Sequence, residues 1–164
     1  MNRSKNVKVE PVRNGLGIVA LRAFRKGEPV CQLHGRIVTP RAVWKYFDED
    51  PTLGANCYRF AAERYLDPRG KIGAFANHSC RPNVMLVHRR CFLEMRAMAT
   101  IKAGDEVTHD YSTYLGADDV WTMRCNCGER ACRGTVRRFD RLPERTLKRY
   151  VKLGAIPDFI LRTR

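Results

Sequence analysis

Hydrophobic positions between residues 7 and 98 fall in short runs separated by Gly, Pro, Asn and Asp. The clearest of these runs are residues 17–21, 84–87 and 92–95. Short apolar runs bounded by turn-forming residues are typical of β-strands and do not fit a helical bundle. The segments 25–28 and 102–105 each contain Lys, Gly and an acidic residue, and they predict turns between strands. The pattern therefore predicts a mainly β domain.

Two segments instead carry the signals of short helices. The first spans residues 40 to about 47, where Thr39 can cap the helix and proline suits the first helical position. The second, a terminal helix, begins at Pro143 and ends at Gly154. Its apolar stripe consists of Leu147, Tyr150 and Val151. We expect this stripe to pack on the body of the domain.

The length of 164 residues suits one domain with an appendage. We expect a boundary near residue 121, which separates a domain of residues 1–120 from a cysteine-rich, basic segment of residues 121–164. No apolar run approaches the ~18 residues of a membrane-spanning helix, and the N-terminus lacks the apolar core of a signal peptide. These features predict an intracellular protein, in the cytoplasm, nucleoid or nucleus, with no membrane partner.

Basic residues are concentrated at the C-terminal end of the chain. The formal net charge is +14, and residues 124–164 hold 12 Lys and Arg against four Asp and Glu. A solvated surface accounts for many such runs. Alternatively, arginines of this segment dock on nucleic acid or an acidic partner, because guanidinium groups match phosphate and carboxylate. The candidates are Arg133, Arg137, Arg138 and Arg141.

The seven cysteines favour a metal site over a disulfide framework, because their number is odd and four are scattered among apolar residues. Cys125, Cys127 and Cys132 form a C-x-C-x4-C arrangement, close enough for three thiolates to bind one ion. A structural zinc ion needs four ligands. Spacing alone leaves the fourth open among Cys31, Cys57, Cys80, Cys91 and a histidine.

Four motifs in order resemble the SET domain with its post-SET zinc segment. They are the Gly-x-Gly and Lys-Gly-Glu segment of residues 14–28, Asn-His-Ser-Cys-Arg-Pro-Asn at 77–83, Asp-Glu-Val-Thr-His-Asp-Tyr at 105–111, and the cysteine cluster. The similarity runs from about residue 7 to residue 134. It implies a β-clip SET fold of several small sheets, in which residues 77–83 and the strand leading to Tyr111 form a pseudo-knot. It also implies transfer of a methyl group from S-adenosylmethionine to a lysine of a protein substrate.

The resemblance assigns roles to individual residues. Tyr111 lies beside the methyl-transfer point, and Tyr58 is the expected second tyrosine of the lysine channel. The expected cofactor-binding residues are Leu16, Gly17, Asn77, His78 and Tyr111. The expected zinc ligands are Cys80, Cys125, Cys127 and Cys132, which leaves Cys31, Cys57 and Cys91 as small buried hydrophobic residues. Adenine stacking stays open among Trp121, Phe139 and Leu142.

The implied chemistry requires a neutral amine. An unperturbed lysine, with a pKa of ~10.4, is almost wholly protonated near neutral pH. A dry aromatic channel and the nearby sulfonium charge both disfavour the ammonium form. His109 stands where the family usually has Phe or Tyr, and we expect it to hold a water or hydrogen-bond the amine, favouring a monomethyl product.

Two alternatives concern partners. One is an inactive SET-like zinc module that binds nucleic acid through its basic tail. The other is a methyltransferase that this tail brings to a histone-like or ribosomal substrate on DNA or RNA. The presence of Tyr111, Asn77 and His78 together argues against the inactive module.

Overall fold

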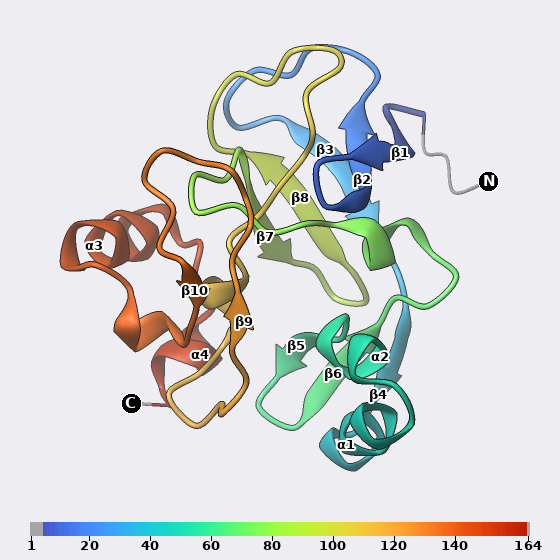
Figure 1. The fold of residues 1–164 in the computed structure, drawn as a ribbon, viewed down its shortest axis with the longest axis vertical. Helices are drawn as coiled ribbons and strands as arrows, with labels where there is room; N and C mark the ends of the chain where they lie inside the picture. The colour runs from blue at the N-terminus through green and yellow to red at the C-terminus, as the bar shows by residue number, and fades with distance from the viewer. Residues whose placement is uncertain (1–4, 164) are drawn as a thin grey trace.

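The computed structural model describes residues 5–163, and strands dominate the part of the molecule that they form (Figure 1). Within these residues the strands make four small antiparallel sheets. The sheets are β1 (Val7–Val12) with β2 (Gly15–Ala20); β3 (Pro29–Leu33), β8 (Leu93–Ala97) and β7 (Val84–His88) in that order; β4 (Arg36–Val38), β6 (Arg64–Asp67) and β5 (Tyr58–Ala61) in that order; and β9 (Met123–Arg124) with β10 (Thr135–Val136). The mainly β fold expected from the hydrophobic pattern is confirmed.

Short helices lie around these sheets (Figure 1). They are α1 (Pro40–Glu49), α2 (Pro51–Ala55), α3 (Glu144–Leu153) and α4 (Asp158–Leu161), with the 3-10 turns η1 (Ile72–Phe75), η2 (Tyr111–Tyr114) and η3 (Phe139–Arg141). Both predicted helices are present. The Thr39 hydroxyl accepts a hydrogen bond from the Ala42 backbone N–H at 3.4 Å, and α3 ends at Gly154 with a φ of 66°. None of the helices among residues 5–163 is long and apolar enough to cross a membrane.

The predicted turns also form. The backbone N–H of Glu28 donates to the carbonyl of Arg25 at 3.1 Å, and that of Asp105 donates to the carbonyl of Lys102 at 3.2 Å. Each turn leads the chain into a strand or bridge of the sheet region.

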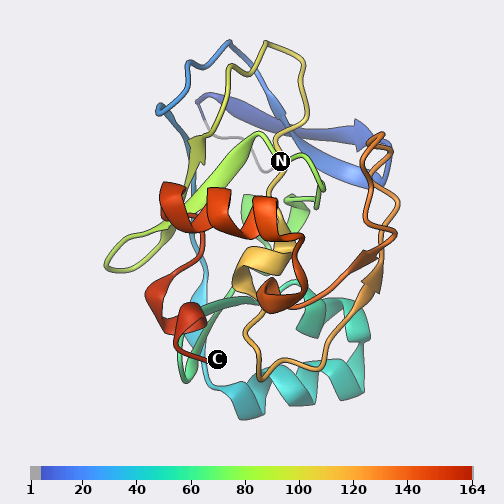
Figure 2. The ribbon, with the colours of Figure 1, turned by 90° about the vertical axis from the view of Figure 1, so that its left-hand side faces the viewer.

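Two hydrophobic clusters organise the interior. The larger joins the sheets around Ile18, Leu33 and Met95. The smaller joins Tyr150 of α3 to α4 and to Met98, which follows β8. Figure 2 shows α3 lying across the sheet region. The α3 stripe was predicted in part wrongly, because Val151 is 48% exposed while Leu147 and Tyr150 pack inward.

The chain crosses itself next to the second motif. The backbone N–H of His109 donates to the carbonyl of Asn77 at 3.2 Å, and that of Ser79 donates to the carbonyl of His109 at 3.1 Å. On the other side of the segment that contains His109, the Val107 backbone N–H donates to the carbonyl of Ile18 at 2.7 Å. Residues 105–110 therefore run between β2 and residues 77–83, as the predicted pseudo-knot requires.

Candidate active site and cysteine cluster

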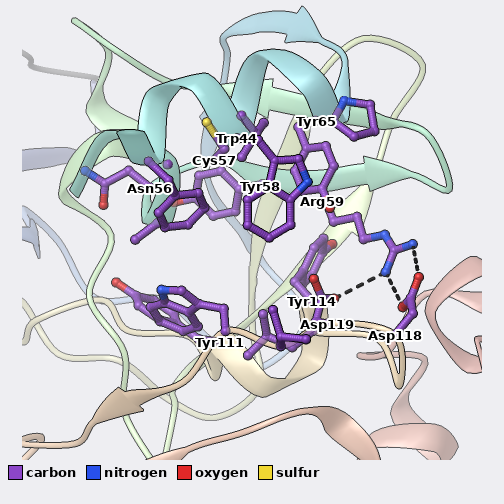
Figure 3. A pocket seen from close by; sticks show the side chains of 18 of the residues that line it. Trp44, Asn56, Cys57, Tyr58, Arg59, Tyr65, Tyr111, Tyr114, Asp118 and Asp119 are labelled. Carbon is purple, nitrogen blue, oxygen red and sulfur yellow. Dashed lines mark hydrogen bonds and ion pairs between the residues drawn. The ribbon is translucent and has the colours of Figure 1, made fainter. Parts of the chain in front are cut away.

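A cavity of about 400 Å³ opens between two walls of the molecule (Figure 3). One wall comes from α1, α2, β5 and β6 and carries Trp44, Tyr58 and Tyr65. The other comes from η2 and residues 115–121 and carries Tyr111 and Tyr114. The three residues expected to act on the amine, Tyr58, His109 and Tyr111, all line this cavity.

The two tyrosines are held in the same way. The Tyr58 hydroxyl donates to the carbonyl of Gly73, and the Tyr111 hydroxyl donates to the carbonyl of Ala76, both at 2.7 Å. Desolvation raises the pKa of both phenols above their usual value, and the charge of Glu106 adds to the effect at Tyr111. Both side chains therefore stay protonated, and because each proton is donated to the main chain, each oxygen is left as an acceptor.

His109 lies between these tyrosines, with ring centroids 5.7 Å from Tyr58 and 4.9 Å from Tyr111. It is 3% exposed, and its Nδ1 atom has no hydrogen-bond partner. Burial, followed by the neighbouring His78, lowers the pKa of His109 to about 3. The imidazole is neutral near pH 7, and a buried ring nitrogen without a partner can bond a group that enters the cavity.

The residues expected at the cofactor come together around Asn77. Its amide nitrogen donates to the carbonyl of Leu16 at 3.1 Å and to Glu106 at 2.8 Å. A Cβ on Gly17 would lie 2.6 Å from a carboxylate oxygen of Glu106, so the backbone at this position approaches Glu106 more closely than any residue other than glycine permits. Leu16, Gly17 and Asn77 thus lie together, and none of the three lines the cavity.

The His78 side chain is engaged within the protein. Its Nδ1 accepts the backbone N–H of Tyr111 at 3.2 Å, and its Nε2 lies 3.4 Å from the sulfur of Cys80. The residue is 5% exposed. A contact between His78 and a cofactor would therefore come from its main chain, whereas its imidazole links Tyr111 to the cysteine cluster.

The adenine candidates are divided by burial. Phe139 is 0% exposed and Leu142 is 7% exposed, and both belong to the smaller hydrophobic cluster. Trp121 lines the cavity instead, with its ring centroid 6.4 Å from that of Tyr111. Phe139 and Leu142 were wrong candidates, because interior packing already covers them.

Cys80, Cys125, Cys127 and Cys132 converge, with their sulfur atoms all within 4.8 Å of one another. The sulfurs of Cys80 and Cys125 are 3.7 Å apart. A tetrahedral zinc site with Zn–S bonds of ~2.3 Å requires sulfurs about 3.8 Å apart, so the cluster fits that ion. Against the effect of burial, backbone hydrogen bonds and neighbouring thiols lower the pKa of Cys127 to about 7, whereas burial raises the pKa values of Cys80 and Cys125.

The other three cysteines lie outside this cluster, and none of the seven, all within residues 5–163, forms a disulfide. Cys31 is buried and Cys57 is half-buried. Cys91 is exposed, so its prediction as a buried hydrophobic residue was wrong.

A buried ion pair that sequence reasoning missed connects the tail to the site. The Arg133 guanidinium donates to both oxygens of Asp110, at 2.7 and 2.8 Å, and the Tyr150 hydroxyl donates to the same carboxylate at 3.0 Å. The Asp110 side chain is 1% exposed. Arg133 is therefore unavailable for docking on nucleic acid, and Arg138 is paired with Asp140 at 3.1 Å. The only sequence signal for this pair was that each partner is next to a predicted site residue: Asp110 precedes Tyr111, and Arg133 follows Cys132.

A second missed ion pair joins the two walls of the cavity (Figure 3). Arg59 of β5 bonds both oxygens of Asp118, at 2.7 and 2.8 Å, and lies 3.2 Å from Asp119. The guanidinium is largely buried, with the side chain 7% exposed. These bonds hold residues 115–121 against β5.

The SET domain family model matches residues 15–112, which is more than half of the chain. Together with the threaded fold and the tyrosine-lined cavity, this match establishes that the chain belongs to the SET domain family.

Similar proteins carry related names. The chain is 35% identical over 75 residues to "Histone-lysine N-methyltransferase SETDB2" of Xenopus laevis, covering 41% of this chain and 11% of that protein. It is 29% identical over 133 residues to "Histone-lysine N-methyltransferase, H3 lysine-36 specific" of Cryptococcus neoformans, covering 76% of this chain and 16% of that protein. The chain thus spans only a small part of these relatives. Among solved structures, the methyltransferase domain of human histone-lysine N-methyltransferase SETMAR matches with a TM-score of 0.67 at 25% identity, covering 80% of this chain and 58% of that one.

Proposed function

We propose that this protein transfers a methyl group from S-adenosylmethionine to the side-chain amine of a lysine in a protein substrate. The observation that carries the proposal is the position of Tyr111: it lines the cavity, and its hydroxyl is fixed to the carbonyl of Ala76, directly before Asn77. A phenol in the cavity wall that is bonded to the residue before Asn77 supports methyl transfer at this point.

Leu16, Gly17 and Asn77 would hold the cofactor, together with the main chain of His78. The fit rests on the close packing of Gly17 against Asn77 and Glu106, where only a residue without a Cβ lets these segments meet. When bound, S-adenosylmethionine supplies an activated methyl group on a positively charged sulfur.

The cavity residues act by orienting a neutral amine. Tyr58 and Tyr111 offer acceptor oxygens and keep their own protons, so they position the amine and do not deprotonate it. Their burial and that of His109 disfavour an ammonium ion, which must lose its proton to solvent before transfer. Holding the amine in line with the methyl group then supplies much of the acceleration.

His109 is proposed to set the number of methyl groups. Its neutral ring and partnerless Nδ1 suit a hydrogen bond to the amine or to a water beside it. Such a bond occupies the space and orientation that further methylation needs, so the expected product is monomethyl-lysine. Mass spectra dominated by trimethyl-lysine would contradict this assignment.

We also propose one structural zinc ion bound by Cys80, Cys125, Cys127 and Cys132. The converging sulfurs support it. Cys80 belongs to the segment that continues from Asn77 and His78, so the ion would tie the C-terminal segment to the body of the domain. We propose that the chain divides into a SET domain of residues 1–120 and a post-SET segment of residues 121–164.

The proposed substrate is a histone-like or ribosomal protein, acted on inside the cell, in the nucleus, nucleoid or cytoplasm. The names of the similar proteins, which include H3 lysine-36 and H3 lysine-4 specific enzymes, support the histone-like class. The inactive zinc module gains no support from these names. Nucleic-acid binding by the tail would depend on Arg137 and Arg141, since Arg133 and Arg138 are paired within the protein.

The test begins with calorimetric titration of the zinc-loaded protein with S-adenosylmethionine, followed by transfer of labelled methyl groups to recombinant core histones and ribosomal proteins. In the Tyr111→Phe variant we expect near-normal cofactor affinity and a fall in turnover of about tenfold or more, because one oriented oxygen is lost. Binding without transfer to any lysine, or full turnover in this variant, would overturn the proposal.

A further inference from the structure

One face of α1 lines the cavity. Pro40, Val43, Trp44, Phe47 and Asp48 all border it, at the spacing that places residues on one side of a helix. Of these five, only Val43 is buried. Trp44 is 60% exposed although it lies in the cavity wall (Figure 3). An apolar helix face that borders a cavity and leaves an indole accessible is suited to an incoming group.

The cavity has more room than the target amine needs. Its volume of about 400 Å³ lies in the range that accommodates drug-sized ligands, which are larger than one lysine side chain. His109, whose Nδ1 has no hydrogen-bond partner, lines the cavity together with Tyr58 and Tyr111, and these three residues are the proposed site of the target amine. The side of the cavity formed by α1, where Trp44 lies, is then available to a second group.

Charge indicates what that group is. The cavity borders three carboxylates, those of Asp48, Asp118 and Asp119, and one guanidinium, that of Arg59. In a protein with a formal net charge of +14, this is a locally negative site. Arg59 pairs with Asp118 and Asp119, whereas the Asp48 carboxylate has no hydrogen-bond or ion-pair partner among the described residues.

We propose that Trp44 and Asp48 form a binding site for a second basic side chain of the substrate, a lysine or arginine that flanks the target lysine. Trp44 and Asp48 are four residues apart on α1, so they are neighbours on its surface. A cation with a long apolar stem can lie over the indole while its charge meets the carboxylate. The inference rests on the proposed lysine methylation and specifies its substrate as a locally basic polypeptide.

The first experiment is a positional peptide library with one fixed central lysine, assayed for methyl transfer by the zinc-loaded protein. We expect enrichment of Arg or Lys at one flanking position. In Asp48→Asn the preference should fall by roughly two- to fivefold, the range of a partly exposed ion pair, mainly through KM. Glu49→Gln is the matched control, because it removes one charge from the same helix at a residue that pairs with Lys45 and does not line the cavity.

The second experiment requires no methyl transfer. The chain has two tryptophans, so in Trp121→Phe the fluorescence of Trp44 reports directly on its surroundings. The peptide acetyl-Ala-Arg-Ala-Ala-amide should shift this fluorescence in a saturable way, and the added Asp48→Asn substitution should weaken binding roughly two- to fivefold. Saturable binding without transfer to any peptide would overturn the methyltransferase proposal alone. No saturable binding, or a basic preference that persists in Asp48→Asn, would overturn the Trp44–Asp48 site.

Discussion

Replacing Arg133 with methionine should strongly destabilise the protein. The substitution removes two charge-assisted hydrogen bonds to Asp110, at 2.7 and 2.8 Å, and leaves a carboxylate that is 1% exposed without its cation. Hydrogen bonds to charged groups contribute about 1.5–3 kcal/mol each. Removal of one partner from a buried pair typically costs about 3–5 kcal/mol. Since domains of this kind are stable by about 5–15 kcal/mol, the loss would be a large part of the total.

The remaining partners of Asp110 do not offset the loss, because the Tyr150 hydroxyl and the Ser112 backbone N–H are neutral donors. The free energy of unfolding should be measured by urea denaturation at a fixed zinc concentration, since bound metal shifts apparent stability. Hydrogen exchange at the Tyr111 amide, which donates to His78, would show whether the site also loosens. Faster exchange is expected.

Lys148→Met is the control, because Lys148 pairs with Glu144 on the surface, where the side chains are 74% and 78% exposed. Its cost should stay below about 0.5 kcal/mol. A loss of less than about 1 kcal/mol in Arg133→Met, with unchanged exchange at Tyr111, would refute the idea that this ion pair anchors the tail to the site.

Two further predictions concern the metal and the buried histidine. Cys127→Ser should lower the zinc content from about one ion per chain and loosen residues 121–164, because metal binding and local folding are coupled; full zinc content by atomic emission would place the metal elsewhere. The pKa of His109 is lowered to about 3. Below pH ~6.5 the unfolded chain therefore binds a proton that the folded protein does not, and stability falls as the pH drops toward 3. Between pH 7 and pH 5 His109 should contribute about 2 kcal/mol to this loss. His78 and His88, whose pKa values burial also lowers, contribute in both proteins, so the loss should be smaller in His109→Phe by the His109 share; identical pH slopes for the two proteins in urea unfolding would contradict this.

The sequence by itself determined the local elements and the family. Capping by Thr39 and the left-handed end at Gly154 depend on neighbouring residues only, so both helices were predictable. The short apolar runs likewise predicted strands. The motifs at residues 77–83 and 105–111 identified the SET fold because their order and spacing are specific. The burial of single residues was predicted less well, because Val151 and Cys91 were expected to be buried and are exposed.

Only the tertiary structure decided which distant side chains meet. The pairing of Asp110 with Arg133, the bridge from Arg59 to Asp118, and the meeting of Trp44 of α1 with Tyr111 around one cavity join residues that no local rule relates. The same holds for Phe139, whose aromatic ring is of a type that can stack on adenine but is buried in the smaller hydrophobic cluster. Hydrophobic periodicity and capping act over a few residues, whereas ion pairing and cavity shape depend on how the chain threads residues 105–110 between β2 and residues 77–83.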